Sequence, residues 1–396
     1  MAAPVPPASR ELTPVSLRDL CLYFLKLGAL GFGGPIALAG YMRRDLEEQR
    51  HWVTDDEYQD GLAIAQTMPG PLAAQLAMWI GYIRYGVLGA SLVGVLFILP
   101  PFLLVLAVAA IYDAVEGLSQ IRALFYGIGP AAIAIITLAA WKLAKTTNKV
   151  DPKLWAVSAA LMAITIITHS ELAYLFIVAG LLGILVYARP KRWPRWRVRR
   201  KPRLAGLVPF APGSIGFLPV ISGTTLVAVG LFFLKAAAFT FGSGLAIVPF
   251  LHQGVVVEHK WLTEHQFLDA VAMGLISPGP VVIMATFVGY LAAGFLGAVV
   301  ATIAVFAPVW VFNVVIGRIF LRYRQNPQVR GFVKGVTAAA VGAIAGAAVL
   351  LGRGAITDVW TVVIFAAALL ILYVRKLKEP YVVGLAGLAG LLLYSR

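Results

Sequence analysis

Two lysines stand at matched positions inside strongly apolar stretches of this sequence. Lys26 and Lys235 each precede a glycine-rich segment by about five residues. An isolated lysine in hydrocarbon costs about 2.5 kcal/mol or more on insertion scales, so a repeated one needs a physical reason. Two lysines together could neutralise a bound dianion. The alternative is that each flexible side chain carries its ammonium group to the membrane interface.

Two aspartates and several neutral polar residues accompany these lysines. Asp60 and Asp269 could bind and release a coupled proton, or could simply favour the positively polarised starts of their helices. Neutral side chains nearby could donate hydrogen bonds to the oxygens of an oxyanion, although hydroxyl groups also bond within their own helices. These neutral residues are Gln66, Thr67, Gln75 and Ser277.

Glycine and proline interrupt the apolar pattern twice in each stretch. The first interruption is Gly31–Pro35, with its counterpart at Thr240–Gly244, and the second is Pro69–Pro71, with its counterpart at Pro278–Pro280. Glycine allows a ligand to approach the backbone, and proline can begin a helix without losing a needed donor. The free N–H groups at the positive end of a helix then form an anion site. The alternative is that each interruption is only a kink or a packing feature.

We therefore predict that an oxyanion binds near the middle of the membrane, at the starts of half-helices. The predicted substrate-binding residues are Lys26, Gly33, Gly34, Pro35, Gln66, Thr67, Pro69, Gly70, Gln75, Lys235, Gly242, Ser243, Gly244, Ser277, Pro278 and Gly279.

The elements that position these residues begin at recognisable caps. Thr54 with Glu57, and Thr263 with Gln266, have the spacing of capping boxes. A helix from Thr54 to Thr67 is about 20 Å long, whereas half of a hydrocarbon core is about 15 Å. The pattern predicts helices that enter the membrane and break near its middle. A further helix is expected to begin near Ser16.

The sequence contains this unit twice. Phe24–Pro71 aligns with Phe233–Pro280 at a constant offset of 209 residues, with 14 identities in 48 pairs, and the offset is 208 beyond the Pro-Gly-Pro triplets. The loops of the two copies carry opposite charge. The loop Asp113–Gln120 has two acids and no base, whereas its counterpart Gly317–Arg330 is strongly basic. Because basic loops stay cytoplasmic, we expect two repeats of opposite membrane orientation, as in many secondary transporters.

Composition excludes a soluble protein. Apolar residues make up 60% of the 396 residues and charged residues 13%, with a mean hydropathy of +0.86, whereas soluble domains carry about 25% charged residues. Long apolar runs recur along the chain, so the expected fold class is an all-α polytopic membrane protein with broken or re-entrant helices. The expected organisation is an N-terminal tail (1–16), a first transporter repeat (17–188), a basic cytoplasmic linker (189–216) and a second repeat (217–396).

Several other kinds of site and partner are disfavoured. We expect no cleavable signal peptide, because residues 1–14 lack an apolar core. The single cysteine, Cys21, excludes an internal disulfide, and the spacing of the histidines does not suit a metal site, so no metal or cofactor is expected. Nine basic residues in Arg189–Arg203 could bind nucleic acid, but the linker is better explained as a solvated cytoplasmic loop.

The segment from Lys26 to Pro71, and its weaker copy from Lys235 to Pro280, resemble the chromate transporter family in its long two-domain form. The resemblance covers essentially the whole chain. It implies a multi-pass protein of the bacterial inner membrane that exports chromate and confers chromate resistance, with two homologous halves of opposite orientation. The second copy has Ser243-Gly244 where the first has Gly34-Pro35, so the two halves need not contribute equally to a site.

Two other functions stay open at this point. Sulfate is also a tetrahedral dianion, so a transporter of sulfate or another small anion is an alternative. An intramembrane lipid-phosphate enzyme is less favoured, because it needs acidic, basic and nucleophilic side chains at one depth and the histidines here fall in loops or at helix ends. The expected partners are an oxyanion and the lipid bilayer, without nucleic acid, and a homodimer stays open.

Overall fold

The protein is helical throughout the part of the chain that the structure describes. This computed structural model describes residues 12–32, 34–115, 119–168, 173–188, 225–238, 240, 244–317, 319, 323, 326–375 and 377–394, and no strand occurs among them. Four helices are long and apolar enough to cross a membrane. This confirms the all-α polytopic fold class. We call residues 12–188 the first half and residues 225–394 the second half; the predicted linker 189–216 lies outside the described residues.

The first half begins with a helical hairpin, in which the chain turns at the glycine break and comes back to its own start. Helix α1 (Leu17–Leu30) starts at the predicted place, where the Ser16 side chain accepts a hydrogen bond from the backbone of Asp19. After the glycine break, α2 (Gly34–Met42) continues into the π-helix η1 (Arg43–Gln49). The chain then lies beside its own start, because the backbone N–H of Thr13 donates to the oxygen of His51 at 3.0 Å. The two helices therefore form a hairpin.

A second hairpin follows directly. The predicted capping box of Thr54 and Glu57 is present at the start of α3 (Asp55–Thr67), and the helix ends before the Pro-Gly-Pro triplet as expected. Helix α4 (Leu72–Val115) is broken at Tyr85–Gly86, where Gly86 has a φ of 60°. Its first part runs back along α3, since the indole of Trp79 donates to the oxygen of Glu57 at 3.1 Å. Its second part, residues 87–115, is a long apolar helix that we call the crossing part of α4.

The second half repeats this arrangement. Its elements are α8 (Thr225–Ala238), η2 (Gly244–Ile247), α9 (Val248–His252), η3 (Gln253–Glu258), α10 (Glu264–Ile276), η4 (Val281–Ile283), α11 (Met284–Val311) and η5 (Phe312–Ile316). The capping box of Thr263 and Gln266 is present. Helix α11 breaks at Ala293–Gly294, which is the counterpart of Tyr85–Gly86 at the offset of 208. We call residues 295–311 the crossing part of α11.

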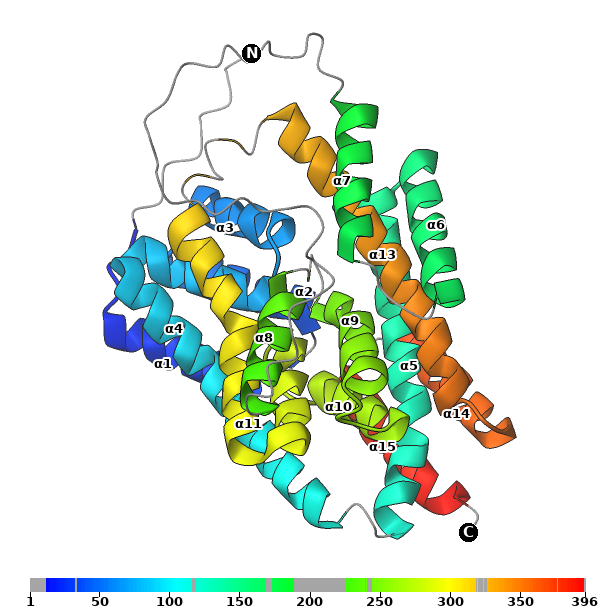
Figure 1. Ribbon diagram of the computed structural model, residues 1–396. Helices are drawn as coiled ribbons and strands as arrows, with labels where there is room; N and C mark the ends of the chain where they lie inside the picture. Colours follow the sequence, from blue (N-terminus) through cyan, green and yellow to red (C-terminus); the bar gives the residue numbers. More distant parts are fainter. Residues whose placement is uncertain are drawn as a thin grey trace.

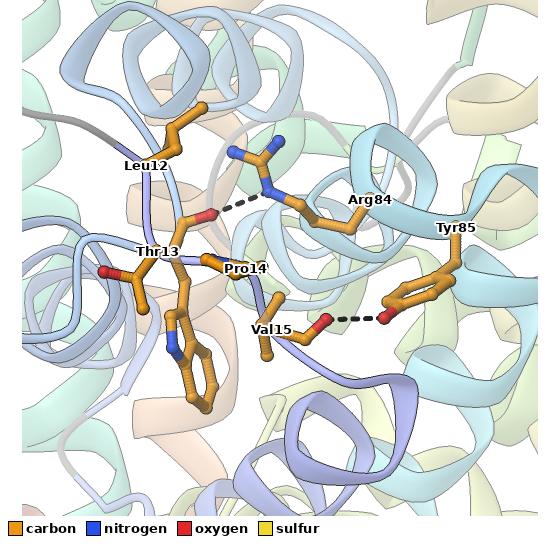
Figure 2. Close-up of a pocket in the computed structure, with 7 residues that line it drawn as sticks. Leu12, Thr13, Pro14, Val15, Arg84 and Tyr85 are labelled. Carbon is orange, nitrogen blue, oxygen red and sulfur yellow. Dashed lines mark hydrogen bonds between the residues drawn. The ribbon is translucent and has the colours of Figure 1, made fainter.

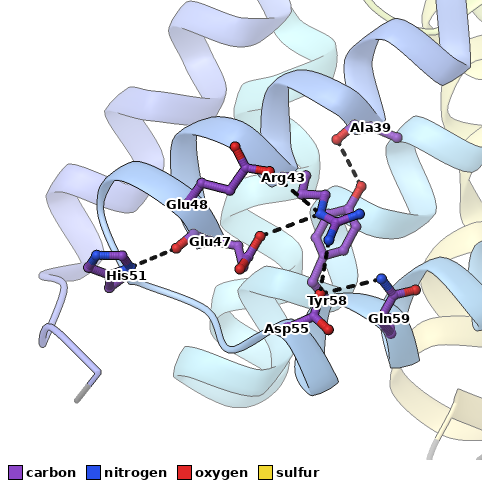
Figure 3. A network of polar contacts seen from close by, with 8 residues as sticks. All are labelled: Ala39, Arg43, Glu47, Glu48, His51, Asp55, Tyr58 and Gln59. Carbon is purple, nitrogen blue, oxygen red and sulfur yellow. Dashed lines mark hydrogen bonds and ion pairs between the residues drawn. The ribbon is translucent and has the colours of Figure 1, made fainter. Parts of the chain in front are cut away.

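One pair of surface contacts shows how closely the halves correspond. In the first half, Arg43 pairs with Asp55 at 3.3 Å within the network of Figure 3. In the second half, His252 pairs with Glu264 at 2.8 Å, and both residues are the exact counterparts at the offset of 209. In each half the contact joins the segment before the capping box, η1 or α9, to the start of the next helix, α3 or α10. The duplication seen in the sequence is therefore also a duplication of contacts.

The remaining helices are exchanged between the halves. In the first half these are α5 (Ser119–Asn148), α6 (Pro152–Thr168) and α7 (Ala173–Tyr187). In the second half they are α13 (Pro327–Ala355), α14 (Val359–Leu370), the π-helix η6 (Ile371–Arg375) and α15 (Glu379–Leu393). Helices α6 and α7 pack on α13, and α14 and α15 pack on α5 (Figure 1).

Small residues allow the helices of one half to pack closely on those of the other. A Cβ atom added to Gly183 would lie 2.1 Å from the backbone oxygen of Gly331, and one added to Gly127 would lie 1.9 Å from that of Ala386. Close approach of backbones at small residues is the usual way in which helices associate in membranes. Each half thus completes the helix bundle of the other.

The two crossing parts run in opposite directions where α4 meets α11 (Figure 1). Near the start of the crossing part of α4, the hydroxyl of Ser91 accepts a hydrogen bond at 2.9 Å from the indole of Trp310, near the end of the crossing part of α11. Near the end of the crossing part of α4, Tyr112 contacts α10 of the second half. The two crossing parts therefore lie side by side, and that of α4 also contacts a hairpin of the second half.

Two tyrosine–aspartate hydrogen bonds hold the exchanged helices. Tyr126 on α5 donates to Asp358 before α14 at 2.5 Å, and Tyr187 on α7 donates to Asp151 before α6. These hydrogen bonds are the first cause that keeps the pKa of Asp358 and of Asp151 below the ordinary value of the carboxyl group. The first bond joins the two halves, whereas the second lies within the first half.

We expect Tyr126→Phe to lower the unfolding temperature of the detergent-solubilised protein at pH 7. Because the folded pKa of Asp358 is depressed, the bond stabilises the protein above the unfolded pKa and this stabilisation is lost as the pH falls through the folded pKa. The difference from wild type should thus be full at pH 7 and should shrink as the pH falls below the ordinary pKa of the carboxyl group. The exposed Tyr381 provides the control, Tyr381→Phe. Equal unfolding temperatures at pH 7 would contradict the role of Tyr126.

Candidate functional site

The four helix breaks meet between the two halves through a pair of backbone hydrogen bonds. The N–H of Gly70 donates to the oxygen of Thr240 at 2.5 Å, and the N–H of Gly279 donates to the oxygen of Gly31 at 2.9 Å. Gly70 and Gly279 are counterparts at the offset of 209, and so are Gly31 and Thr240. Each Pro-Gly-Pro break of one half is therefore bonded to the glycine-rich break of the other. We call this meeting point the central crossing.

The central crossing is tightly packed. Gly70 has a φ of 126° and Gly279 a φ of 82°, values that other residues rarely adopt. A Cβ atom on Gly70 would lie 2.8 Å from Val309 on α11, and one on Gly279 would lie 3.0 Å from Pro101 on α4. Val309 and Pro101 are again counterparts, at the offset of 208. Each Pro-Gly-Pro break is thus packed closely against the crossing part of the opposite half.

Gln75 supports the first Pro-Gly-Pro break from within the protein. Its side chain is fully buried, and its Nε2 donates to the backbone oxygen of Met68 at 3.2 Å and to that of Pro69. Its Oε1 is buried and has no hydrogen-bond partner. The sequence predicts Gln75 as a donor to the anion, but here its N–H groups are used by the break itself. Its free group is an acceptor.

The other predicted neutral residues lie in different surroundings. Gln66 is exposed and Thr67 is half-buried, whereas Ser277 is buried and its hydroxyl donates to the oxygen of Gly274 at 3.3 Å. The bond of Ser277 is the local alternative that the sequence left open. Pro69 is half-buried and Pro278 buried in the two breaks themselves.

The glycine-rich breaks are described only in part. In the first half, Gly34 has a φ of 72° and begins α2, with Pro35 next to it in the first turn. In the second half, Gly244 is buried, and a Cβ atom there would lie 3.8 Å from Pro71 of the first half. The predicted site residues Gly33, Gly242 and Ser243 lie outside the described residues.

The two lysines are not brought into the central crossing. Lys26 on α1 and Lys235 on α8 are both exposed on the outer surface of the protein. That position suits the interfacial alternative, in which the ammonium group reaches the edge of the membrane. Their contact with an anion stays a prediction of the sequence alone.

The two aspartates differ in their surroundings. Asp269 on α10 is 7% exposed, and the Tyr112 hydroxyl, from α4 of the other half, donates to its Oδ2 at 2.6 Å. Asp60, its counterpart, is half-buried on α3. The sequence reasoning missed Tyr112, because a tyrosine at the end of a long apolar run is typical of an interfacial aromatic residue.

Sequence reasoning also missed an arginine at the base of the first hairpins. The Nη1 of Arg84 lies 3.1 Å from Oε1 of Glu57, and its Nε donates to the oxygen of Trp52 at 2.7 Å. A cavity of about 340 Å³ opens beside it (Figure 2). The cavity is lined by Leu12, Thr13, Pro14, Val15, Trp52, Arg84 and Tyr85. In the second half Ala292 stands at the position of Arg84, so this feature belongs to one half.

Among the residues that the structure describes, no group of three or more histidine, cysteine or acidic side chains is arranged to hold a metal ion. In the described part of the central crossing, the polar groups include backbone amides and carbonyls, the side chain of Gln75 and the hydroxyl of Thr240, which donates to the oxygen of Ala236 at 2.9 Å. Such groups can bind and release an anion or a water molecule by exchanging hydrogen bonds.

Comparison with known proteins agrees with this arrangement. The family model for the chromate transporter matches the chain twice, over residues 18–184 and 227–391. A chromate transport protein of Cupriavidus metallidurans is 47% identical over 100% of this chain and 99% of its own length. A probable chromate transport protein of Synechococcus elongatus is 48% identical, over 96% of each chain. A chromate transport protein of Pseudomonas aeruginosa is 32% identical, over 96% of this chain and 93% of its own.

No solved structure matches the chain. The family match covers both halves, and the relatives are matched over nearly their whole length. The chain is therefore a multi-pass membrane protein and a transporter rather than an enzyme, and it belongs to the chromate transporter family.

Proposed function

We propose that this protein is a secondary transporter that exports chromate across the bacterial inner membrane and so confers chromate resistance. The named relatives support chromate as the substrate. The observation that carries the mechanism is the pair of hydrogen bonds at the central crossing, because they hold four helix breaks of two halves together at one place. A path for an ion that is closed at one point by breakable bonds is what alternating access requires.

The backbone N–H groups of Gly70 and Gly279 are the proposed anion donors. In the closed structure each donates to a carbonyl oxygen of the other half. When the halves move apart, each N–H loses this acceptor and becomes available beside the start of a returning helix, where the helix dipole favours negative charge. Binding of the oxyanion would replace the lost hydrogen bonds. The exchange keeps the amides satisfied in both states, so it costs little free energy.

We further propose that the halves have opposite orientations in the membrane. The opposite charges of the loops Asp113–Gln120 and Gly317–Arg330 support this arrangement. The contact of Tyr112 with Asp269 also supports it. Tyr112 lies 25 residues beyond Val87, or about 37 Å along the helix. The contact with α10 is thus far from Val87, where the crossing part of α4 leaves the hairpins of the first half.

Cysteine labelling tests the orientation. With Cys21 replaced by serine, we expect Ser119→Cys to be labelled from the periplasm and Gln328→Cys from the cytoplasm by a membrane-impermeant maleimide in intact cells and inside-out vesicles. Both positions are exposed, so accessibility depends on the side of the membrane. The cysteine-free protein is the control for background labelling. Labelling of both positions from one side would refute the inverted arrangement.

Transport by a glycine variant tests the site. We expect wild-type inside-out vesicles to accumulate chromate, and Gly70→Ala vesicles with the same amount of protein to accumulate almost none. The added Cβ would lie 2.6 Å from Nε2 of Gln75, in a backbone conformation that alanine rarely adopts. Such strain and overpacking cost about 1–3 kcal/mol. Gly40→Ala is the matched control, because nothing lies within 4 Å of its added Cβ. Wild-type transport by Gly70→Ala would show that the break is only a packing feature.

A further inference from the structure

A buried acid of the second half is hydrogen-bonded to a phenol of the first half. Asp269 is 7% exposed and Tyr112 is 5% exposed, and the hydroxyl of Tyr112 donates to Oδ2 of Asp269 at 2.6 Å. The ring of Tyr112 is packed between Phe125 of α5 and Phe287 of α11, with ring centroids 5.5 Å and 5.1 Å away. The pair is therefore buried where the two halves meet, and the ring of Tyr112 lies between two apolar rings.

The charged residues on the elements that pack against α10 are more exposed than Asp269. Helix α10 packs against α5, α11, α13, α15, η3 and η4. Neither α11 nor η4 contains a charged residue. On the other elements, all the charged residues are exposed apart from the half-buried Glu379. They are Arg122, Lys142, Lys145, Glu258, Arg330, Lys334, Arg353 and Glu379. Helix α4 also contacts α10 through Tyr112, whose neighbour Asp113 is exposed, and the half-buried His252 of α9 lies 2.8 Å from Glu264 at the start of α10.

The strength of this contact depends on the protonation of Asp269. A hydrogen bond from a hydroxyl group to an ionised carboxylate is shorter and roughly twice as strong as one to a neutral group. Apolar surroundings increase this difference, because little water competes. Addition of a proton to Asp269 therefore weakens the bond between the halves without breaking any covalent bond. The proton comes from water on one side of the membrane and leaves to water later, while Tyr112 keeps its own proton.

The pair lies between the two segments that also meet at the central crossing. Asp269 is on α10, which leads to the break at Gly279, and Tyr112 is on the crossing part of α4, which contacts that same break at Pro101. Tyr112 lies 11 residues beyond Pro101, which is about 16 Å along the helix. A weaker bond at Asp269 thus loosens the same helix contact that keeps the Gly279 break closed.

The sequence does not repeat this pair of residue types. The counterpart of Asp269 is Asp60, but the counterpart of Tyr112 is Phe320, which has no hydroxyl group. Asp60 is also only half-buried. The combination of a tyrosine and an acid is therefore not duplicated, and the two acids differ in burial.

We propose that Asp269 carries the proton that drives transport and that Tyr112 is the positioning residue that holds the ionised acid against α4. This inference rests on the proposed transport function and deepens it. Ionised Asp269 keeps the second half closed, and protonated Asp269 lets it open. Proton uptake and the exposure of the anion path are then two results of one event.

The test uses the full-length protein in proteoliposomes and measures chromate in two assays. Exchange of chromate is measured with equal pH on both sides, and net accumulation is measured with an imposed pH gradient. We expect Asp269→Asn to retain exchange, to lose its pH dependence and to lose accumulation in the gradient. We expect Tyr112→Phe to retain exchange but to shift the midpoint of its pH profile upward by about one unit, since the ionised acid loses one hydrogen bond.

Two control variants separate this role from a merely structural one. Tyr58→Phe also removes a buried hydroxyl, which donates to the oxygen of Ala39 at 2.8 Å, and the second half already has Phe267 at the corresponding position. Asp113→Asn removes the exposed acid next to Tyr112 on α4. We expect both controls to keep the wild-type pH profile and accumulation. An unchanged pH profile in Tyr112→Phe, or accumulation by Asp269→Asn, would overturn the proposal.

Infrared titration in detergent tests the acid without using chromate. A protonated carboxyl band should appear as the pH falls, should be absent in Asp269→Asn and should appear at higher pH in Tyr112→Phe. No such shift would refute the proposed positioning by Tyr112. If the wild-type protein shows the band and Tyr112→Phe shifts it, but the wild-type protein moves no chromate, the proposed substrate is wrong and the proton site is still supported. If it moves chromate without a band from Asp269, only the proton site fails.

Discussion

The pair of backbone hydrogen bonds at the central crossing is the constraint on which the rest of this structure depends. A backbone N–H group inside a membrane must have a partner, because no water can replace a lost one. At Gly70 and Gly279 the helix is broken, so the partner cannot come from the same helix. Each half supplies it for the other, through the oxygens of Thr240 and Gly31. The helix breaks are thus stable only when both halves are present.

Outside the central crossing, each half also depends on the other, because its helices pack on helices of the other half. Helices α6 and α7 pack on α13, and α14 and α15 pack on α5, through backbone contacts at glycine. Such contacts need small residues and are lost when a bundle opens, so they favour a frame that does not move. The hairpins that end at the crossing meet the other half through the hydrogen bonds of Gly70 and Gly279 and through packing against α11 and α4. The outer helices and the crossing therefore differ in the kind of contact that joins the halves.

The halves are similar in backbone but differ in chemistry. Arg84 and the cavity beside it occur in the first half, whereas the buried Asp269 is bonded across the halves from the second. His252 replaces Arg43 in otherwise corresponding contacts with an acid. Duplication therefore supplied a symmetric frame, and later substitutions gave each side its own charges.

Much of the fold could be predicted from local patterns. The capping boxes at Thr54 and Thr263 and the breaks at the two Pro-Gly-Pro triplets depend on residues within a few positions of each other, so their spacing is enough to identify them. The duplication is visible for the same reason, because it preserves the order of residue types. The apolar composition determined the helical fold class, since every backbone group in a membrane must be satisfied.

Tertiary structure decided which of these features work together. Tyr112 and Asp269 are 157 residues apart, and Gly70 is bonded to the other half rather than to its own. No local pattern contains such a choice, because it depends on how two complete hairpins pack. Only the structure shows that the amide N–H groups of Gln75 donate to the backbone of its own break and that Lys26 and Lys235 are exposed. A sequence shows which polar groups a membrane must satisfy, but only packing decides which partner satisfies each one.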